Sequence, residues 1–198
     1  MSIVDPIQIA LRVGSALEML GLAYHLGGSL ASSLYGEPRA TNDIDIVVDL
    51  PLDKVPALAD TLGPDFAIDR ESLAEAVRSR GTCNVFYLPQ FTKVDLFVAE
   101  RGIYERAEMR RRKRIPVGDA GEALFVKSPE DMVLRKLLWF REGGGLSEKQ
   151  WRDVVQILRL NRGALDEAVF EEWAPALGVD HLLAKARVAA RNDEASET

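Results

Sequence analysis

The spacing of apolar residues changes once along this chain, near residue 127, and the change constrains the fold more than any other feature. Before it, β-branched segments such as Asp-Ile-Asp-Ile-Val-Val at 43–48 alternate with segments of helical spacing, a pattern typical of strands between helices. After it, the apolar spacing is helical. The order predicts an α/β (α+β) lobe over residues 1–127, a helical lobe over 128–190 and a frayed polar tail over 191–198.

Proline, glycine and helix-capping residues predict where individual helices and strands begin and end. Pro89-Gln90 separates two apolar stretches that we expect to form a hairpin or two neighbouring strands. In the second half, Ser128 and Ser147 have the spacing of helix caps, and three glycines follow the first of these helices. We expect helices over 6–21, 29–35, 54–62, 72–79, 128–142, 147–160, 166–176 and 181–190, and strands over 23–26, 43–48, 83–88 and 92–98.

The composition excludes several classes of protein. The 198 residues include 25 Lys and Arg against 31 Asp and Glu, a net charge of -6, which argues against coating nucleic acid through global charge. A single cysteine, Cys83, excludes a disulfide framework and a cysteine-based zinc site. No apolar run approaches the roughly 18 residues of a membrane span, and the first residues lack the pattern of a signal peptide. We therefore expect a cytoplasmic globular protein with no membrane partner.

Three aspartates form the first candidate for chemistry. Asp43 and Asp45 stand two apart in a predicted strand and therefore point to the same face, while the isoleucines between and after them point to the core. Adjacent carboxylates repel each other, and Mg²⁺ is their natural partner because it prefers hard oxygen ligands. Asp95 lies in another predicted strand, 92–98, and joins the pair if the two strands are neighbours.

The Gly27-Gly28-Ser29 sequence supplies a second candidate, for binding phosphate. Two glycines allow backbone to approach a phosphate closely, and a helix that begins at Ser29 directs N–H groups and its positive dipole end toward an anion. Each feature alone is more often an ordinary turn or helix cap. Together with three acids, they indicate phosphoryl or nucleotidyl transfer.

These residues resemble the nucleotidyltransferase (polymerase-beta-like) superfamily. The resemblance is carried by Gly-Gly-Ser, by Arg-Ala-Thr-Asn-Asp-Ile-Asp-Ile at 39–46 and by the later Asp95. The chain is similar to a short bacterial branch near the abortive-infection (AbiEii-like) toxins, and the segments at 128–137 and 152–155 resemble the helical lobe of that branch. The resemblance implies a minimal nucleotidyltransferase mixed sheet flanked by helices, followed by a helical lobe.

The resemblance also implies a role for each acid. Asp43 and Asp45 would bind two Mg²⁺ ions. Asp95 would bind the catalytic ion and help to activate the acceptor hydroxyl. The implied enzyme is a two-metal, NTP-dependent nucleotidyltransferase.

A second set of residues is implied to bind the NTP. Gly28 and Ser29, in the turn that begins at Gly27, would hold the β- and γ-phosphates. Lys136 would reach the triphosphate from the helical lobe. Arg39 is close enough in sequence to the acids to contact a phosphate or the acceptor.

Several functions remain open at this point. The acceptor of the transferred NMP is an RNA such as tRNA, a protein, or a small hydroxylated molecule of the antibiotic type. A toxin–antitoxin role, with an antitoxin as partner, follows from the same resemblance. A nucleotide-binding or partner-binding module without turnover is the alternative of another class.

Residues 106–114, here called the basic segment, hold six basic residues in nine. One interpretation is a solvated helix end followed by a loop. The other is a local patch that contacts RNA phosphates or the NTP. The sequence favours neither.

Overall fold

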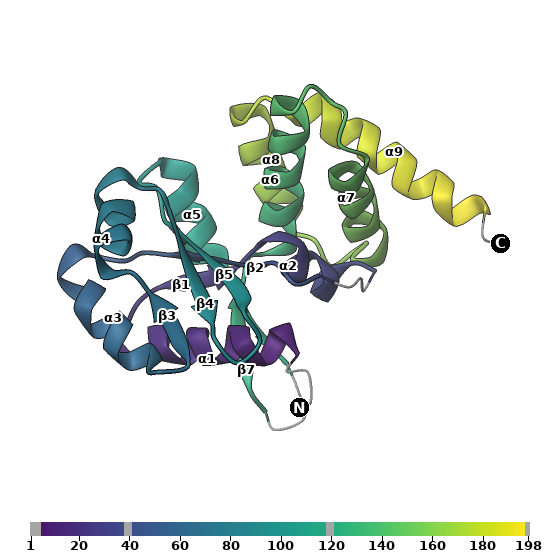
Figure 1. Cartoon of the computed structure of the whole chain (residues 1–198). Helices are drawn as coiled ribbons and strands as arrows, with labels where there is room; N and C mark the ends of the chain where they lie inside the picture. The colour runs from purple at the N-terminus through teal and green to yellow at the C-terminus, as the bar shows by residue number, and fades with distance from the viewer. Residues whose placement is uncertain (1–4, 38–40, 118–120, 197–198) are drawn as a thin grey trace. The chain divides into compact units, whose positions relative to one another are not determined.

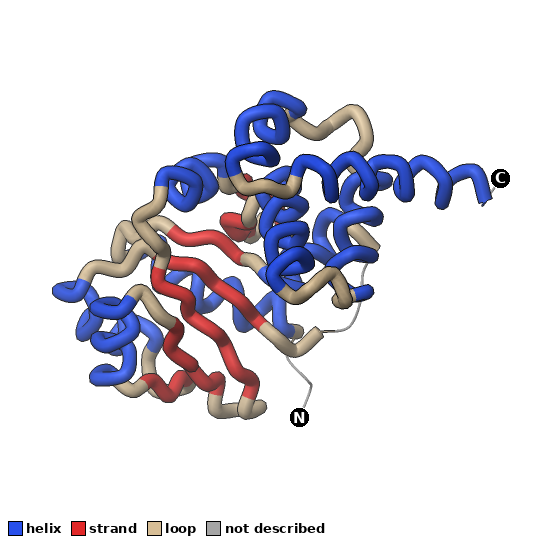
Figure 2. Tube along the Cα trace, turned by 90° about the horizontal axis from the view of Figure 1, so that it is seen from above, coloured by secondary structure: helices blue, strands red, loops and turns tan. Residues whose placement is uncertain are grey.

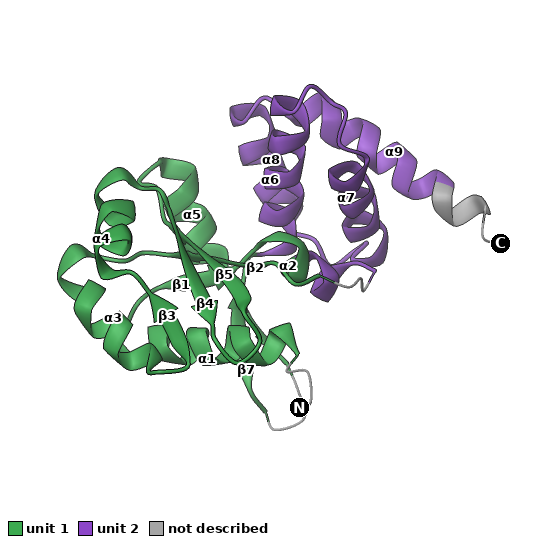
Figure 3. Ribbon diagram, viewed as in Figure 1, with its two compact units in different colours: residues 1–31, 40–127 green, residues 32–39, 128–198 purple. Residues whose placement is uncertain are grey.

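The structure is a computed structural model that describes residues 5–37, 41–117 and 121–196. The chain divides into two compact units, residues 1–31 with 40–127 and residues 32–39 with 128–198 (Figure 3). Residues 32–39 fall within the range predicted for the α/β lobe, 1–127, but the structure groups them with the helical unit. The division falls inside one helix, α2 (Gly28–Tyr35).

The first unit is built around a mixed sheet. In the order in which the strands lie side by side, the sheet reads β3-β4-β5-β2-β1-β7-β6. Neighbours β2 and β5 are parallel, as are β1 and β7, and the other pairs are antiparallel. The elements in chain order are α1 (Pro6–Met19), β1 (Tyr24–Leu26), α2, β2 (Ile44–Val48), a 3₁₀ turn (Leu52–Lys54), α3 (Val55–Leu62), β3 (Phe66–Ile68), α4 (Arg70–Ser79), β4 (Thr82–Tyr87), β5 (Thr92–Val98), α5 (Ile103–Arg111), β6 (Lys113–Pro116) and β7 (Ala123–Val126).

Alternation along the central strands separates a core face from a polar face. Along β2, Ile44, Ile46 and Val48 are fully buried, whereas the residues between them are partly exposed. Strands β4 and β5 alternate in the same way. Helix α1 packs against β1 and β7, and α4 packs against β4 and β5 (Figure 1). The sheet thus carries its polar side chains on one face, and the predicted α/β class with a mixed sheet flanked by helices is confirmed.

The second unit is helical (Figure 2). It contains α6 (Pro129–Glu142), α7 (Glu148–Leu160), α8 (Glu167–Ala176) and α9 (Asp180–Ser196). Hydroxyl and carboxylate caps at Ser128, Ser147 and Asp166 begin the first three of these helices. Helix α9 continues to Ser196, where we expected fraying from residue 191. That stretch contains no glycine or proline, so nothing in it terminates a helix.

The structure contains short strands that the apolar pattern does not predict. Strands β3, β6 and β7 have three or four residues each, too few for alternation to stand out. The basic segment forms the end of α5 and the beginning of β6, an edge strand, rather than a helix end followed by a loop. No helix within the described residues is long and apolar enough to cross a membrane.

Candidate active site

Asp45 and Asp95 lie directly beside each other in the sheet. Strands β2 and β5 are parallel neighbours, and the register pairs Asp45 with Asp95. Partners in neighbouring strands are about 5 Å apart and point to the same face. The Asp95 side chain is 15% exposed. The condition that the sequence left open, that the two strands are neighbours, is therefore met, and both acids lie on the polar face of the sheet.

Lys93 provides a cation that all three predicted acids influence. Its ammonium nitrogen lies 2.8 Å from Asp95 Oδ2. The hydrogen bond to Asp95 is the main cause of a raised pKa at Lys93, and the negative charges of Asp95, Asp43 and Asp45 raise this pKa further. Asp43 is exposed one residue before β2, where its N–H donates to Thr41 Oγ1. All three acids therefore favour the charged form of the Lys93 ammonium group.

The turn after β1 is joined to β2 at Asp45. The Gly27 N–H donates to the backbone oxygen of Asp45 at 2.8 Å. Gly28 has a φ of 60°, in the left-handed region, and a Cβ atom added to it would stand 1.7 Å from Asp45 Oδ2. Glycine is required here for both conformation and space. The carboxylate of Asp45 is therefore in contact with the backbone of the turn.

Ser29 lies in the first turn of α2 and is 8% exposed. The first N–H groups of a helix have no partner within the helix, and its dipole makes that end positive. Residues 27–29, here called the phosphate turn, thus place anion-attracting backbone beside the carboxylate of Asp45. A metal-bound nucleotide would bring its cation to the Asp45 carboxylate and its phosphates to the backbone N–H groups of the turn.

A buried ion pair lies behind the phosphate turn. Lys127 follows β7, and its N–H donates to Leu26 O at 2.9 Å. Its ammonium group lies 2.7 Å from Glu108 Oε1 of α5, with side chains only 5% and 4% exposed. The Lys127 Cε atom is 3.9 Å from the position that a Cβ at Gly27 would take. The pair links α5, β7 and the turn.

Two further NTP ligands were predicted, Arg39 and Lys136. Arg39 lies outside the described residues. Lys136 of α6 is 1% exposed, and its ammonium group donates to Gln150 Oε1 at 3.0 Å and to Asp153 Oδ2 at 2.7 Å within the helical unit. These contacts give Lys136 a structural role in holding α6 to α7, and its triphosphate role stays a prediction.

The donor set suits Mg²⁺ in its chemistry. Carboxylate oxygens from Asp45 and Asp95 are the ligands this ion prefers, and the Lys93 ammonium already stands as a cation against Asp95. Within residues 5–37, 41–117 and 121–196, no three His, Cys, Asp or Glu side chains are gathered as a ready-made metal site. Magnesium ions keep several waters and bind through one or two carboxylates plus substrate phosphates, so two neighbouring acids suffice as an anchor.

Sequence reasoning assigned no role to Lys93, Asn84 or the Lys127–Glu108 pair. Lys93 stands two residues before Asp95, the spacing that puts both on one face, so this signal was present. Asn84 of β4 is the other register neighbour of Asp95 and is exposed. Nothing in the local sequence links Lys127 to Glu108, because only the packing of α5 brings them together.

No family model and no curated protein matches the chain. Among solved structures, it is similar to an antigenic nucleotidyltransferase-like protein from Paracoccidioides brasiliensis, with a TM-score of 0.53, 17% identity and coverage of 93% of each chain. It is also similar to the antibiotic-resistance factor ANT(2'')-Ia, with a TM-score of 0.48, 16% identity and coverage of 98% of this chain and 96% of that one. For the lincosamide antibiotic adenylyltransferase LnuA, the TM-score is 0.49 at 12% identity, with 81% of this chain and 99% of that one covered.

At 17% identity, the similarity to the P. brasiliensis structure shows the fold alone. The mixed sheet, the order of its strands and the likeness to the P. brasiliensis structure over 93% of both chains together show that this chain has a nucleotidyltransferase fold.

Proposed function

We propose that the chain is an Mg²⁺-dependent nucleotidyltransferase that moves an NMP from an NTP to an acceptor hydroxyl. The resemblance of its motifs to the nucleotidyltransferase (polymerase-beta-like) superfamily supports this proposal. One structural observation carries it: Asp45 and Asp95 are register partners, and the backbone of Gly28 lies against the Asp45 carboxylate. The backbone that we propose to bind phosphate is therefore in contact with one of the carboxylates that we propose to bind the metal.

Each group has a distinct task in the proposed reaction. The phosphate turn binds the β- and γ-phosphates through backbone N–H groups and the Ser29 hydroxyl. Asp95 accepts the proton of the acceptor hydroxyl, whose oxygen attacks the α-phosphorus while pyrophosphate leaves. Asp43, Asp45 and Asp95 would hold Mg²⁺, which when bound supplies charge for the attacking and leaving oxygens. Lys93 pairs with the Asp95 carboxylate and orients it in the free protein.

An RNA or a protein is the acceptor in this proposal, and the resemblance to AbiEii-like toxins is what supports that choice. The exposed part of the basic segment supports RNA. The same resemblance supports an antitoxin as partner. A small hydroxylated acceptor of the antibiotic type is the alternative outcome of the experiment below.

The test is incubation with each α-labelled NTP, Mg²⁺ and cell extract, followed by separation of RNA, protein and small molecules. We expect label in one of these fractions with wild type and loss of at least a hundredfold in rate for Asp45→Asn or Asp95→Asn, the order of magnitude for removing a group that acts on the transition state. Asp49→Asn is the matched control, because Asp49 is an exposed aspartate just after β2.

Binding and turnover are measured separately to distinguish a transferase from a module that binds the nucleotide without turnover. Titration with a non-hydrolysable NTP reports binding, and pyrophosphate release reports transfer. Binding without release by the wild-type protein, in every extract tested, would make the chain a nucleotide-binding module and would exclude the transferase. Equal transfer by Asp45→Asn and Asp49→Asn would show that the acids have been assigned wrongly.

A further inference from the structure

The first unit contains an open pocket beside the candidate active site that the proposed reaction leaves without a role. The pocket lies at the edge of the sheet formed by β3. Its volume is about 560 Å³, within the range of roughly 300–1,000 Å³ for small-molecule sites. Residues of α3, β3, β4 and the beginning of α4 line it: Ala59, Phe66, Ala67, Ile68, Asp69, Arg70, Asn84 and Phe86.

The pocket adjoins Asp95 along the sheet. Asn84 of β4 is the register partner of Asp95, and Phe86 is the register partner of Lys93. Partners in neighbouring strands are about 5 Å apart and point to the same face. Asn84 and Phe86 are exposed and alternate with buried residues of β4. The pocket therefore opens on the polar face, one strand away from the carboxylate that accepts the proton in the proposed reaction.

The pocket and the phosphate turn lie on opposite sides of the acids. The strands lie side by side in the order β4-β5-β2-β1, so Asp95 on β5 and Asp45 on β2 stand between the pocket and the turn after β1. Nucleotidyl transfer is an in-line displacement, in which the attacking oxygen and the leaving pyrophosphate occupy opposite sides of the α-phosphorus. If the phosphate turn holds the leaving phosphates, the attacking hydroxyl approaches from the side of β4.

The wall of the pocket offers an aromatic ring and an amide. Phe86 is 40% exposed, and an aromatic ring is a surface on which a nucleobase stacks. The Asn84 amide provides both hydrogen-bond donors and an acceptor. The two charged side chains of the wall are already paired, Arg70 with Asp60 and Asp69 with N–H groups of the first turn of α4. A neutral planar group with hydrogen-bonding edges suits this wall better than a small polycation does.

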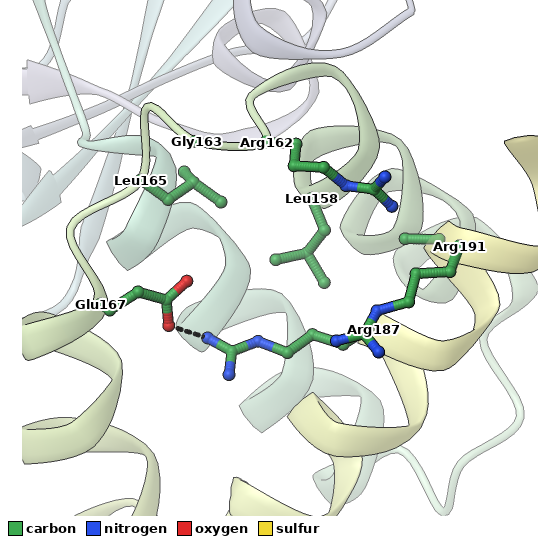
Figure 4. A pocket seen from close by; sticks show the side chains of 8 residues that line it. Leu158, Arg162, Gly163, Leu165, Glu167, Arg187 and Arg191 are labelled. Carbon is green, nitrogen blue, oxygen red and sulfur yellow. Dashed lines mark hydrogen bonds and ion pairs between the residues drawn. The ribbon is translucent and has the colours of Figure 1, made fainter.

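A pocket in the helical unit has a different wall (Figure 4). Among the described residues that line it, none is aromatic and three are arginines, of which Arg187 is paired with Glu167. The ring of Phe86 therefore distinguishes the pocket at β3 as a place for a base.

We propose that the pocket at β3, here called the acceptor pocket, binds the 3′-terminal nucleoside of an RNA acceptor. The base stacks on Phe86 and hydrogen-bonds to the Asn84 amide, and the ribose reaches across one strand spacing to bring its 3′-hydroxyl to Asp95. In the transfer, the 3′-oxygen bonds to the α-phosphorus, the bond between the α-phosphorus and the leaving pyrophosphate oxygen breaks, and the hydroxyl proton passes to Asp95. The assignment as acceptor rests on the proposed function, whereas binding in the pocket is measured without transfer.

The experiment is a binding titration of the full chain, without NTP or Mg²⁺, using four short single-stranded RNAs that differ in the 3′-terminal base. Phe86→Ala should weaken binding about tenfold, as for the loss of one base–aromatic stack. Phe86→Tyr keeps the ring and should bind as wild type. Phe91→Ala is the matched control, because Phe91 is an exposed phenylalanine of the turn between β4 and β5 and is not among the residues lining the pocket.

Folding is checked by the melting temperature of each variant. Phe86→Leu, which keeps an apolar side chain but no ring, repeats the test if Phe86→Ala is destabilised. Phe86→Leu should weaken binding as Phe86→Ala does, because both lack the ring on which the base stacks.

Two further measurements test the base and the end of the RNA. Asn84→Ala should narrow the spread of affinities among the four RNAs, because the amide contacts the edge of the base. An RNA with a 3′-phosphate should bind roughly fivefold more weakly than the same RNA with the phosphate at its 5′ end, because the 3′-phosphate would stand beside the carboxylates of Asp95 and Asp45. The two RNAs carry the same charge, so net charge alone affects them equally.

The results separate the acceptor pocket from the transferase itself. Weaker binding by Phe86→Ala, with normal binding by Phe86→Tyr and Phe91→Ala, supports the pocket whether or not the wild-type protein releases pyrophosphate. A spread of affinities that Asn84→Ala leaves unaltered would contradict the contact between Asn84 and the base. If transfer takes place but Phe86→Ala changes neither RNA affinity nor the KM for RNA, the pocket is wrong while the proposed function stands.

Four other results overturn the inference. None of the four RNAs binds the wild-type protein; Phe91→Ala weakens binding as much as Phe86→Ala does; the 3′-phosphate and 5′-phosphate RNAs bind equally well; or Phe86→Ala weakens binding of a non-hydrolysable NTP and leaves RNA binding intact. The last result would assign the pocket to the base of the NTP.

Discussion

Gly27 and Gly28 are adjacent in the phosphate turn, yet the structure gives them different constraints. A Cβ at Gly28 would meet Asp45 Oδ2 at 1.7 Å, and the φ of 60° disfavours any other residue. At Gly27 the nearest atom to such a Cβ, Asp45 O, is 3.8 Å away. Gly28→Ala should therefore lower the free energy of unfolding by about 1–3 kcal/mol, as for strained backbone, and displace Asp45. Urea unfolding and the transfer assay measure the two effects.

Gly27→Ala is the control for this substitution. The φ of Gly27 is not among the positive values in the chain, and alanine keeps the N–H that donates to Asp45 O. We expect its stability to stay within about 0.5 kcal/mol of wild type. If Gly28→Ala is as stable and active as Gly27→Ala, the contact between Asp45 and the turn contributes neither to stability nor to transfer activity.

Lys93 and a metal ion compete for the same carboxylate in the proposed mechanism. Removing the ammonium group with Lys93→Gln leaves Asp95 beside Asp43 and Asp45 without a neutralising partner. Mg²⁺ should then bind more readily, with half-saturation at an up to about fivefold lower concentration, the range for an exposed ion pair. Titration of the melting temperature with Mg²⁺ and an NTP measures this, and Lys93→Arg, which keeps the charge, should resemble wild type.

The pH dependence expected for Lys93→Gln follows from the direction in which the pKa of Lys93 is shifted. Hydrogen bonding to Asp95 raises the pKa of Lys93, so the pair is fully present below the ordinary lysine value of about 10.4 and is lost only at higher pH. The difference between Lys93→Gln and Lys93→Arg should accordingly stay constant from about pH 6 to about pH 9. A difference that vanishes within this range would contradict the assignment of the cation.

At the scale of elements, the Lys127–Glu108 pair connects helix α5 to the strand beside the phosphate turn. Removing one partner of a buried pair takes away the opposite charge that stabilises the other. Lys127→Met should therefore lower the free energy of unfolding by about 3–5 kcal/mol. The double variant Lys127→Met with Glu108→Leu should recover most of this loss, since a buried pair is often replaceable by apolar residues. Denaturant unfolding of the three proteins checks both statements.

The double variant then tests whether the pair positions the turn. If Lys127 supports Gly27, the folded double variant should show a raised KM for the NTP with a smaller change in kcat, because the proposed role of the turn is to bind the NTP and not to react. An unaltered KM in this folded variant would confine the pair to stability. The KM against kcat comparison separates the two roles without relying on a destabilised protein.

These elements also show which parts of the molecule the sequence predicts. Strands β2 and β5 have five and seven residues with alternating burial, and this alternation identified both strands and the common face of their aspartates. Whether the two strands are neighbours was left open by the sequence, and the structure supplies the parallel pairing that puts Asp45 opposite Asp95. Strands β6 and β7 were missed because four residues carry too little periodicity. The partner of Lys127 was missed because Glu108 lies on α5, and only the packing of that helix brings the two side chains together.

For the molecule as a whole, the basic segment stands out against a net charge of -6. The structure reduces its six cations to a smaller set that is available to a partner. Arg111 and Arg112 lie over the rings of Tyr104 and Phe125, and Arg112 also donates to Met109 O. The exposed Arg106 donates to the backbone oxygen of Arg101. Three further exposed cations at the end of α5 and on edge strand β6 remain for contact with a polyanion: Arg110, Lys113 and Arg114.

If the acceptor is RNA, replacing Arg110, Lys113 and Arg114 by Gln should weaken its binding and reduce the slope of log affinity against log salt by about 2, because each single-strand phosphate contact contributes roughly 0.7. The control is a second triple variant, with Gln at the exposed Arg78, Lys149 and Lys185. Both variants lose three positive charges, so net charge alone affects them equally. An unchanged slope in the first variant, or an equal drop in both, would remove RNA contact from the basic segment. NTP binding should stay unchanged in the first variant if the segment serves the acceptor alone, whereas a raised KM for the NTP would instead place these cations at the triphosphate.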